Sequence, residues 1–224
     1  PELLASGLLD GLAHLVEQLP GAALEARPEL LLYRADAYRI TNDYSNALAW
    51  YAMADDIFAA RSDAAGRSRA LKGRATVYLD TVEPAKSEAL LAQALELLPA
   101  EERLERATLM RMMAESKTNL GQGQEAMRLL REAEQLIDQA MEDELDIRVH
   151  LRTGRLTAAL ALLERRAGDQ ARETAGGAAV RRPARSHRET QLLLSLTYCL
   201  IGQGDRAVAS ARAGVRLGQE LRSP

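Results

Sequence analysis

LLLYRADAYRITNDYSNALAWYAMADDIF, residues 30–58, holds two apolar patterns separated by a short polar break at Asn42 and Asp43. On each side of the break, apolar residues recur every three or four positions, which is typical of amphipathic α-helices. A break of two or three residues forces consecutive helices to pack antiparallel. The stretch therefore predicts one antiparallel helix pair.

The same pattern recurs along the chain. Each copy has a residue early in its pattern and a second, small residue twelve positions later; the five copies carry Ala35 and Ala47, Ala75 and Ser87, Ala114 and Ala126, Ile147 and Ala159, and Ser195 and Ala207. Small residues facing each other let two helix backbones approach closely, and neighbouring Tyr and Leu side chains fill the space toward the next pair. Because one pair cannot bury its apolar face alone, we expect the pairs to stack.

This pattern resembles the tetratricopeptide repeat (TPR), with three departures. The first two repeat spacings are 40 and 39 residues instead of about 34. Leu31, Leu71 and Met110 stand where the usual repeat has Trp, and the fourth copy, with Ile147 and Ala159, matches the pattern loosely. The resemblance implies an all-α, right-handed superhelical solenoid of antiparallel helix pairs with about ten to eleven helices.

We expect one TPR-like domain over residues 1–224. Its parts are a helix at 2–19, helix pairs at 28–61, 63–98, 101–140 and 142–166, a mobile loop at 167–189, and a last pair at 190–221. The chain begins without Met, and we expect it to be a piece of a longer protein.

Composition excludes several classes of protein. The net charge of −3 is close to balance, which gives no case for nucleic-acid or membrane binding by bulk electrostatics. No apolar run approaches the ~18 residues of a membrane-spanning helix. The single cysteine, Cys199, agrees with a reducing, cytoplasmic compartment. It lies in a Leu-rich pattern, and we expect it to be buried.

No catalytic or metal-binding motif is present. His14, His150 and His187 are far apart in sequence, Cys199 has no CxxC partner, and no HExxH, GxSxG or phosphate-loop pattern occurs. We therefore expect a protein that is not an enzyme and carries no cofactor or metal.

Stacked pairs supply a candidate binding surface, because the first helix of each pair lines the inner face of a solenoid. Counted from the alanine positions, that row comprises Asp36, Arg39, Lys72, Thr76, Asp80, Arg111, Glu115, Thr118, Asn119, Arg148 and Arg152. Lys72, Arg111, Asn119 and Arg148 could together hold a carboxylate or an acidic peptide. The alternative is a solvated helix face with ion pairs such as Arg111 with Glu115.

An arginine cluster lies between the last two pairs. It comprises Arg165, Arg166, Arg172, Arg181, Arg182, Arg185 and Arg188. Such a cluster can contact phosphate. It lacks interleaved aromatic residues, and acidic residues dilute it, so we favour a solvated loop without direct nucleic-acid binding.

Residues 30–58, 73–95 (GRATVYLDTVEPAKSEALLAQAL) and 182–224 are similar to the helical-repeat regions of bacterial transcriptional activators of the maltose-regulator-like and bacterial-transcriptional-activator-domain kinds. The resemblance implies a regulatory module that binds a protein, a peptide or a small-molecule inducer; the chain itself holds no ATPase or DNA-binding segment. The alternative is a structural module that forms homodimers through its end faces.

Overall fold

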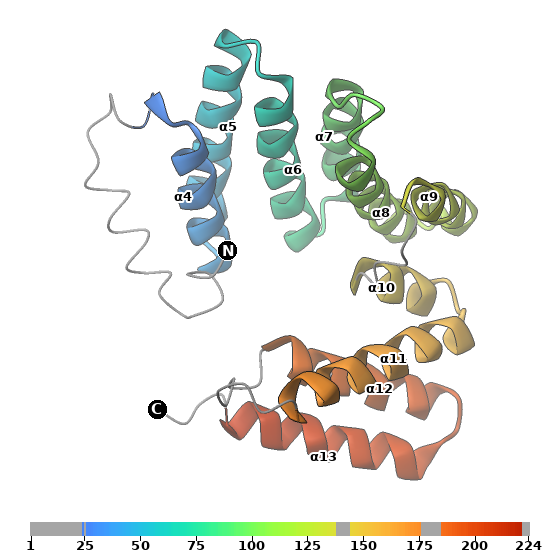
Figure 1. The fold of residues 1–224 in the computed structure, drawn as a ribbon. Coiled ribbons are helices and arrows are strands. Elements are labelled where there is room, and N and C mark those ends of the chain that lie inside the picture. Colours follow the sequence, from blue (N-terminus) through green and yellow to red (C-terminus); the bar gives the residue numbers. More distant parts are fainter. Residues whose placement is uncertain (1–23, 25, 138–143, 176–184, 221–224) are drawn as a thin grey trace. The chain divides into compact units, whose positions relative to one another are not determined.

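The computed structural model describes residue 24 and residues 26–137, 144–175 and 185–220. The described residues form ten helices and no strand (Figure 1). The contacts divide the chain into two compact units, 1–140 and 141–224. The first unit holds α4 (Glu29–Ile40), α5 (Tyr44–Ala60), α6 (Ala64–Asp80), α7 (Pro84–Leu97), α8 (Arg103–Asn119) and α9 (Gly123–Leu136). The second holds α10 (Glu144–Arg152), α11 (Leu156–Ala175), α12 (Arg185–Leu200) and α13 (Gly204–Glu220).

Turns of one repeated geometry reverse the chain between helices. Their central residues are Asn42, Ser62, Val82, Gly121, Gly154 and Gly202, all with φ between 57° and 78°. In each turn the next residue donates its amide to a carbonyl five residues back, as Asp43 N does to Tyr38 O at 2.8 Å and Gln203 N does to Tyr198 O at 2.8 Å. This is the Schellman helix ending. It explains why short breaks in the sequence give tight antiparallel reversals.

Helix starts follow the local sequence. The Asp63 carboxylate accepts the backbone amide of Gly66 at 2.8 Å, and Asp43 accepts that of Asn46 at 3.2 Å. These contacts satisfy amides that have no partner within the helix. Pro84 occupies the first turn of α7, where its missing amide costs nothing.

Small residues allow the close helix packing that the repeat pattern predicts. Ala35 and Ala47 are fully buried between α4 and α5. A Cβ built on Gly73 of α6 would lie 2.2 Å from Tyr51 Cε1, and one on Gly66 would lie 2.1 Å from Phe58 Cδ1. Only glycine therefore leaves room for the two large rings of α5 at this contact.

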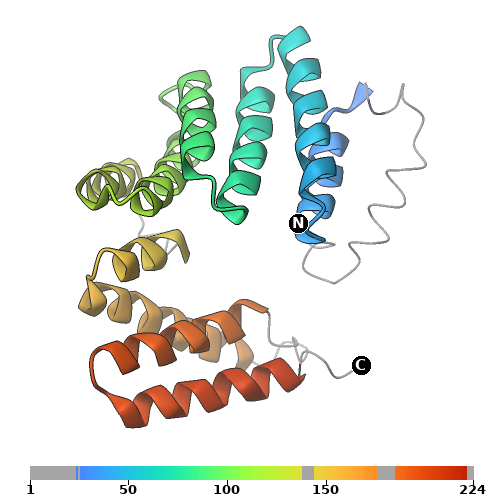
Figure 2. The same cartoon turned by 180° about the vertical axis from the view of Figure 1, so that it is seen from behind.

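Within the first unit each helix packs against the next, and α4 also contacts α6 (Figure 2). The first helices of the first two described pairs, α4 and α6, thus lie next to each other. The predicted all-α class and the stacking of antiparallel helix pairs are confirmed. None of the helices in the described part of the chain has the length and apolarity needed to cross a bilayer.

The second unit is built around Ile147, Leu163, Leu194, Tyr198 and Ala207. In sequence order, each of its helices packs against the one that follows it.

The structure corrects the loop expected at 167–189. Residues 167–175 continue α11, and α12 already begins at Arg185. Ala167 packs against the core of the unit, and Gln170 Nε2 donates to Thr190 Oγ1 at 3.2 Å. These contacts stabilise the C-terminal part of α11, where the sequence no longer shows an apolar period. Residues 2–19 and 176–184 lie outside the described residues.

Candidate functional site

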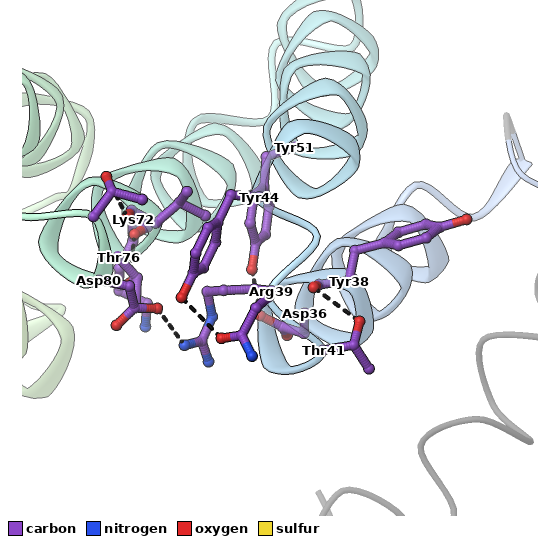
Figure 3. A network of polar contacts seen from close by, with 12 residues as sticks. Asp36, Tyr38, Arg39, Thr41, Tyr44, Tyr51, Lys72, Thr76 and Asp80 are labelled. Atoms are coloured by element: carbon purple, nitrogen blue, oxygen red, sulfur yellow. Dashed lines mark hydrogen bonds and ion pairs between the residues drawn. The ribbon is translucent and has the colours of Figure 1, made fainter.

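Five residues of the expected inner row come together on α4 and α6. Asp36 and Arg39 project from α4, and Lys72, Thr76 and Asp80 from α6 (Figure 3). All except Asp80 line a hollow of about 250 Å³, whose wall also includes Tyr33, Tyr51 and Arg69. The helical period placed these residues on one face, and the packing of α4 beside α6 brings the two rows together.

A hydrogen bond between α4 and α5 fixes one wall of this hollow. Tyr51 Oη donates to Asp36 Oδ1 at 2.5 Å. Burial raises the pKa of Asp36, although the hydrogen bond from Tyr51 and the charges of Arg39 and Lys72 act in the opposite direction. Burial, together with the neighbouring Asp36 carboxylate, also raises the pKa of Tyr51 far above its ordinary value. The phenol therefore stays protonated and keeps donating at neutral pH.

An ion pair joins the ends of α4 and α6. Arg39 Nη1 lies 3.0 Å from Asp80 Oδ2 (Figure 3). Both side chains are partly exposed, so the pair contributes at most about 1 kcal/mol to stability. In the site, this ion pair neutralises the charges of two predicted binding residues.

Lys72 is the cation of the row that stays available. Its backbone carbonyl accepts the Thr76 hydroxyl at 2.9 Å. Among the described residues, its ammonium group has no hydrogen-bond or ion-pair partner. Its positive charge acts against the rise that burial causes in the pKa of Asp36. Lys72 therefore offers three hydrogen-bond donors and a positive charge to a ligand.

A second hollow of about 230 Å³ adjoins the first, since Arg69 and Lys72 line both. Its other walls come from Leu98 and from Glu102, Glu105 and Leu109 at the start of α8 and before it. We call the two hollows together the α4–α6–α8 groove. It has two cations at its centre, carboxylates toward both ends, and apolar patches from Leu32, Leu98 and Leu109.

The remaining predicted residues do not line these two hollows. Arg111 and Glu115 of α8 are only 2% and 3% exposed. The Thr118 hydroxyl donates to its own helix, to Ala114 O at 2.7 Å, and Asn119 is half-buried at the end of α8. Arg148 and Arg152 are exposed on α10, in the second unit. Of the four residues predicted to hold a carboxylate (Lys72, Arg111, Asn119 and Arg148), only Lys72 lines these hollows.

Sequence reasoning missed several groove residues. Arg69 lies one helical turn before Lys72 and faces the same way, so the 3.6-residue period could have identified it. Tyr51 belongs to the second helix of its pair, and Glu102 precedes α8, so neither belongs to the row of first-helix residues. Nothing in the local sequence marks these two as groove residues.

The other residues considered for catalysis, metal binding or phosphate binding do not form a site among the described residues. In the described residues no three His, Cys, Asp or Glu side chains are grouped so that they could hold a metal ion. Cys199 is exposed, which corrects the expectation that it is buried. It follows Tyr198 in α12, and the apolar pattern of that helix continues onto a face that no other described helix covers. In the arginine cluster, Arg172 pairs with Asp169 at 2.6 Å, while Arg181 and Arg182 lie outside the described residues.

Comparison with known proteins supports the fold. No family model matches the chain, and no curated protein matches it. Among solved structures it is similar to nearly identical TPR-like repeats from Podosopora anserina, with 21% identity, a TM-score of 0.61, and coverage of 89% of this chain and 99% of that one. It is also similar to BtubC from P. vanneervenii, with 18% identity, a TM-score of 0.63, and coverage of 98% and 90%.

A third similar structure is the APC/C hetero-tetramer Cut9-Hcn1, with 16% identity and a TM-score of 0.68; 97% of this chain matches 38% of that one. At these identities the likeness establishes the TPR-like helical-repeat fold and does not extend to ligands.

Proposed function

We propose that this chain is a protein-binding module whose α4–α6–α8 groove holds an extended segment of a partner, with a carboxylate of that segment at Lys72. The observation that carries the proposal is that Lys72 lines both hollows and that its ammonium has no partner among the described residues. A cation held at the centre of a groove favours an acidic group there.

The shape of the groove favours a segment over a compact ligand. Each hollow is smaller than the roughly 300–1,000 Å³ of pockets that enclose drug-sized molecules. The two share Arg69 and Lys72 as lining residues, so a chain that reaches both would use more of the surface than a small inducer in one. The bond from Tyr51 to Asp36 and the ion pair from Arg39 to Asp80 hold the wall in place before a ligand arrives, which lowers the entropic cost of binding.

The test is to select peptides from a random library against the purified chain and to measure their affinities by calorimetry. We expect the selected peptides to carry Asp, Glu or a free carboxyl terminus, and Lys72→Ala to weaken their binding. A lost charge-assisted hydrogen bond costs about 1.5–3 kcal/mol, which corresponds to roughly a 10- to 150-fold higher Kd. Lys86→Ala is the matched control, because Lys86 lies on α7 and pairs with Glu83. Equal losses for the two variants would exclude the groove.

A narrower version follows from the resemblance to bacterial transcriptional activators. In that version the groove senses its ligand on behalf of a regulator in a bacterial cytoplasm, and binding shifts a conformational equilibrium of the array. It requires that the full-length gene product contain a DNA-binding or ATPase segment. Sequencing the complete gene tests this directly, and a product with neither segment would refute it.

Self-association is the second candidate function. The observation that favours it is the exposure of Leu192, Leu196 and Leu200 along α12, since contiguous apolar surface often marks an interface. Light scattering over a wide concentration range measures it. A monomer at every concentration would exclude this candidate and leave peptide binding untouched.

A further inference from the structure

The hollow between α6 and α8 is lined by side chains of opposite charge. Arg69 and Lys72 of α6 contribute two cations, and the Arg69 guanidinium carbon lies 5.7 Å from the centre of the Phe58 ring. Glu102, directly before α8, and Glu105, in its first turn, contribute two carboxylates. Among the described residues none of these four charged side chains forms a hydrogen bond or an ion pair. The opposite charges therefore line one hollow without neutralising each other by contact.

The rest of this hollow is mainly apolar. Ala65, Leu98 and Leu109 also line it, and the two leucines are 7% and 1% exposed. Ser68 donates its hydroxyl to Ala94 O at 3.0 Å, so its proton is already used within the fold. An apolar side chain placed here loses no hydrogen bonds, whereas a polar one would give up bonds to water.

The two arginines at the start of α8 bind backbone carbonyls. Arg106 donates to Leu95 O at 3.1 Å and to Leu98 O at 2.9 Å. Arg103 donates to Gln135 O at 3.5 Å. In the part of the chain that the structure describes, neither guanidinium forms an ion pair with a carboxylate of the hollow. The negative charge at this end of the groove is therefore not cancelled by its neighbours.

The other carboxylates near the groove leave this distribution of charge unchanged. Glu101 is exposed directly before Glu102 and adds to the negative charge at the α8 end. In the adjoining hollow, Asp36 already accepts a hydrogen bond from Tyr51, and Glu29 is the other carboxylate. The groove thus has its two shared cations in the middle and a pair of exposed carboxylates at the α8 end.

Glu102 and Glu105 also lie where negative charge stabilises the start of a helix. That role leaves their oxygens available, because Glu102 makes no side-chain hydrogen bond to the amides of α8 and both residues are exposed. Stabilisation of the helix start by charge alone requires no ligand. A ligand contact is therefore distinguished by its dependence on the charge of the ligand.

This arrangement selects against a segment that is acidic throughout. Such a segment would meet Arg69 and Lys72 favourably, but its other carboxylates would lie near Glu102 and Glu105, where like charges cost affinity. A basic side chain at that end instead gains charge-assisted hydrogen bonds.

We propose that Glu102 and Glu105 bind a Lys or Arg side chain of the partner segment, next to an apolar side chain on Leu98 and Leu109 and an acidic group at Lys72. This inference rests on the proposed function and adds the order of charges along the bound segment. Alternate side chains of an extended segment point to the same side, so the acidic, apolar and basic residues occupy every second position.

The first test selects peptides from a random library displayed on phage. The baits are the wild type, Glu102→Gln/Glu105→Gln, and the matched control Glu96→Gln/Glu134→Gln. The control removes the same charge from two exposed residues of α7 and α9 that line neither hollow. We expect the wild type and the control to enrich Lys or Arg two to four positions from an acidic residue. The Glu102→Gln/Glu105→Gln variant should enrich acidic residues without the basic one.

Calorimetry on one peptide selected by the wild type then tests the contact itself. The peptide is synthesised with capped ends, both as selected and with its basic residue changed to glutamine. We expect Glu102→Gln/Glu105→Gln to weaken the selected peptide by at least about tenfold and to leave the affinity of the glutamine peptide nearly unchanged. Unchanged helicity by circular dichroism shows that the variants are folded.

The outcomes separate this inference from the proposed function. Acidic enrichment that requires Lys72 but comes without basic enrichment would refute the order of charges and leave peptide binding at Lys72 standing. Equal losses for the two double variants, or equal losses for the two peptides, would also overturn the contact, since both would indicate general attraction or a structural effect. No enrichment of either charge would refute both proposals.

Discussion

Replacing Gly73 by alanine should unfold the first unit more easily, against the usual preference of helices for alanine. The new Cβ would lie 2.2 Å from Tyr51 Cε1 and 2.5 Å from Tyr51 Cζ. The ring has little room to move, because Tyr51 is 1% exposed and its hydroxyl is bonded to Asp36. Overpacking of this kind costs about 1–3 kcal/mol.

Two further terms decide the net effect of Gly73→Ala. Displacing the ring also endangers a hydrogen bond to a carboxylate, which contributes about 1.5–3 kcal/mol. The higher helix propensity of alanine offsets part of these losses, because alanine stabilises a helix by about 0.5–1 kcal/mol relative to glycine. We therefore expect the free energy of unfolding to fall by about 2–4 kcal/mol.

Urea unfolding followed by tryptophan fluorescence measures this loss, because Trp50 is the single tryptophan and lies in α5 next to Tyr51. Gly168→Ala is the matched control. It also replaces a helical glycine, but no atom outside its own stretch of helix lies within 4 Å of the new Cβ, so it should raise the stability of the second unit by about 0.5–1 kcal/mol. Circular dichroism measures this control, because the single tryptophan lies in the first unit.

A double-mutant cycle with Tyr51→Leu tests the cause. The shorter side chain removes the ring from the path of the new Cβ, so Gly73→Ala should cost less in that background, with a coupling of about 1–2 kcal/mol. A neutral Gly73→Ala, or the same loss in both backgrounds, would refute the packing argument.

Val82 has φ +59° and is 72% exposed, so Val82→Asn should raise the free energy of unfolding by about 0.5–1 kcal/mol by relieving a left-handed conformation that β-branched residues resist. Gly121 has φ +76° and open space around a new side chain, so Gly121→Val should lower the free energy of unfolding by a similar amount. If urea unfolding showed both substitutions to stabilise, or both to destabilise, the chain, the argument from turn conformation would be wrong. Burial raises the pKa of Asp36 above its ordinary 3.8, so the folded chain holds this proton more tightly than the unfolded chain does. Relative to Asp36→Asn, the wild type should lose stability as pH rises from 3.8 through the raised pKa, and parallel stability-versus-pH curves for the two proteins would show that Asp36 is not the cause.

The helical period of the sequence predicts many of the residues that line the groove. Asp36, Arg39, Lys72, Thr76 and Asp80 share one face of their helices, and that face lines the space between α4 and α6. The period could not show that Arg39 and Asp80 neutralise each other, because residues 41 positions apart meet only through packing. The period also could not show that Lys72 lines the groove while Arg111, at the equivalent position of α8, is buried.

The sequence by itself determined the helices, the tight turns between them and the close packing within each pair. These features depend on the spacing of apolar residues, on turn residues and on small side chains, all within short stretches of the chain. Only the tertiary structure decided which faces are covered. A helix presents the same side chains whether or not a neighbour lies on them, so the burial of Arg111, the exposure of Leu196 and Cys199, and the extension of α11 to Ala175 follow from contacts between distant segments.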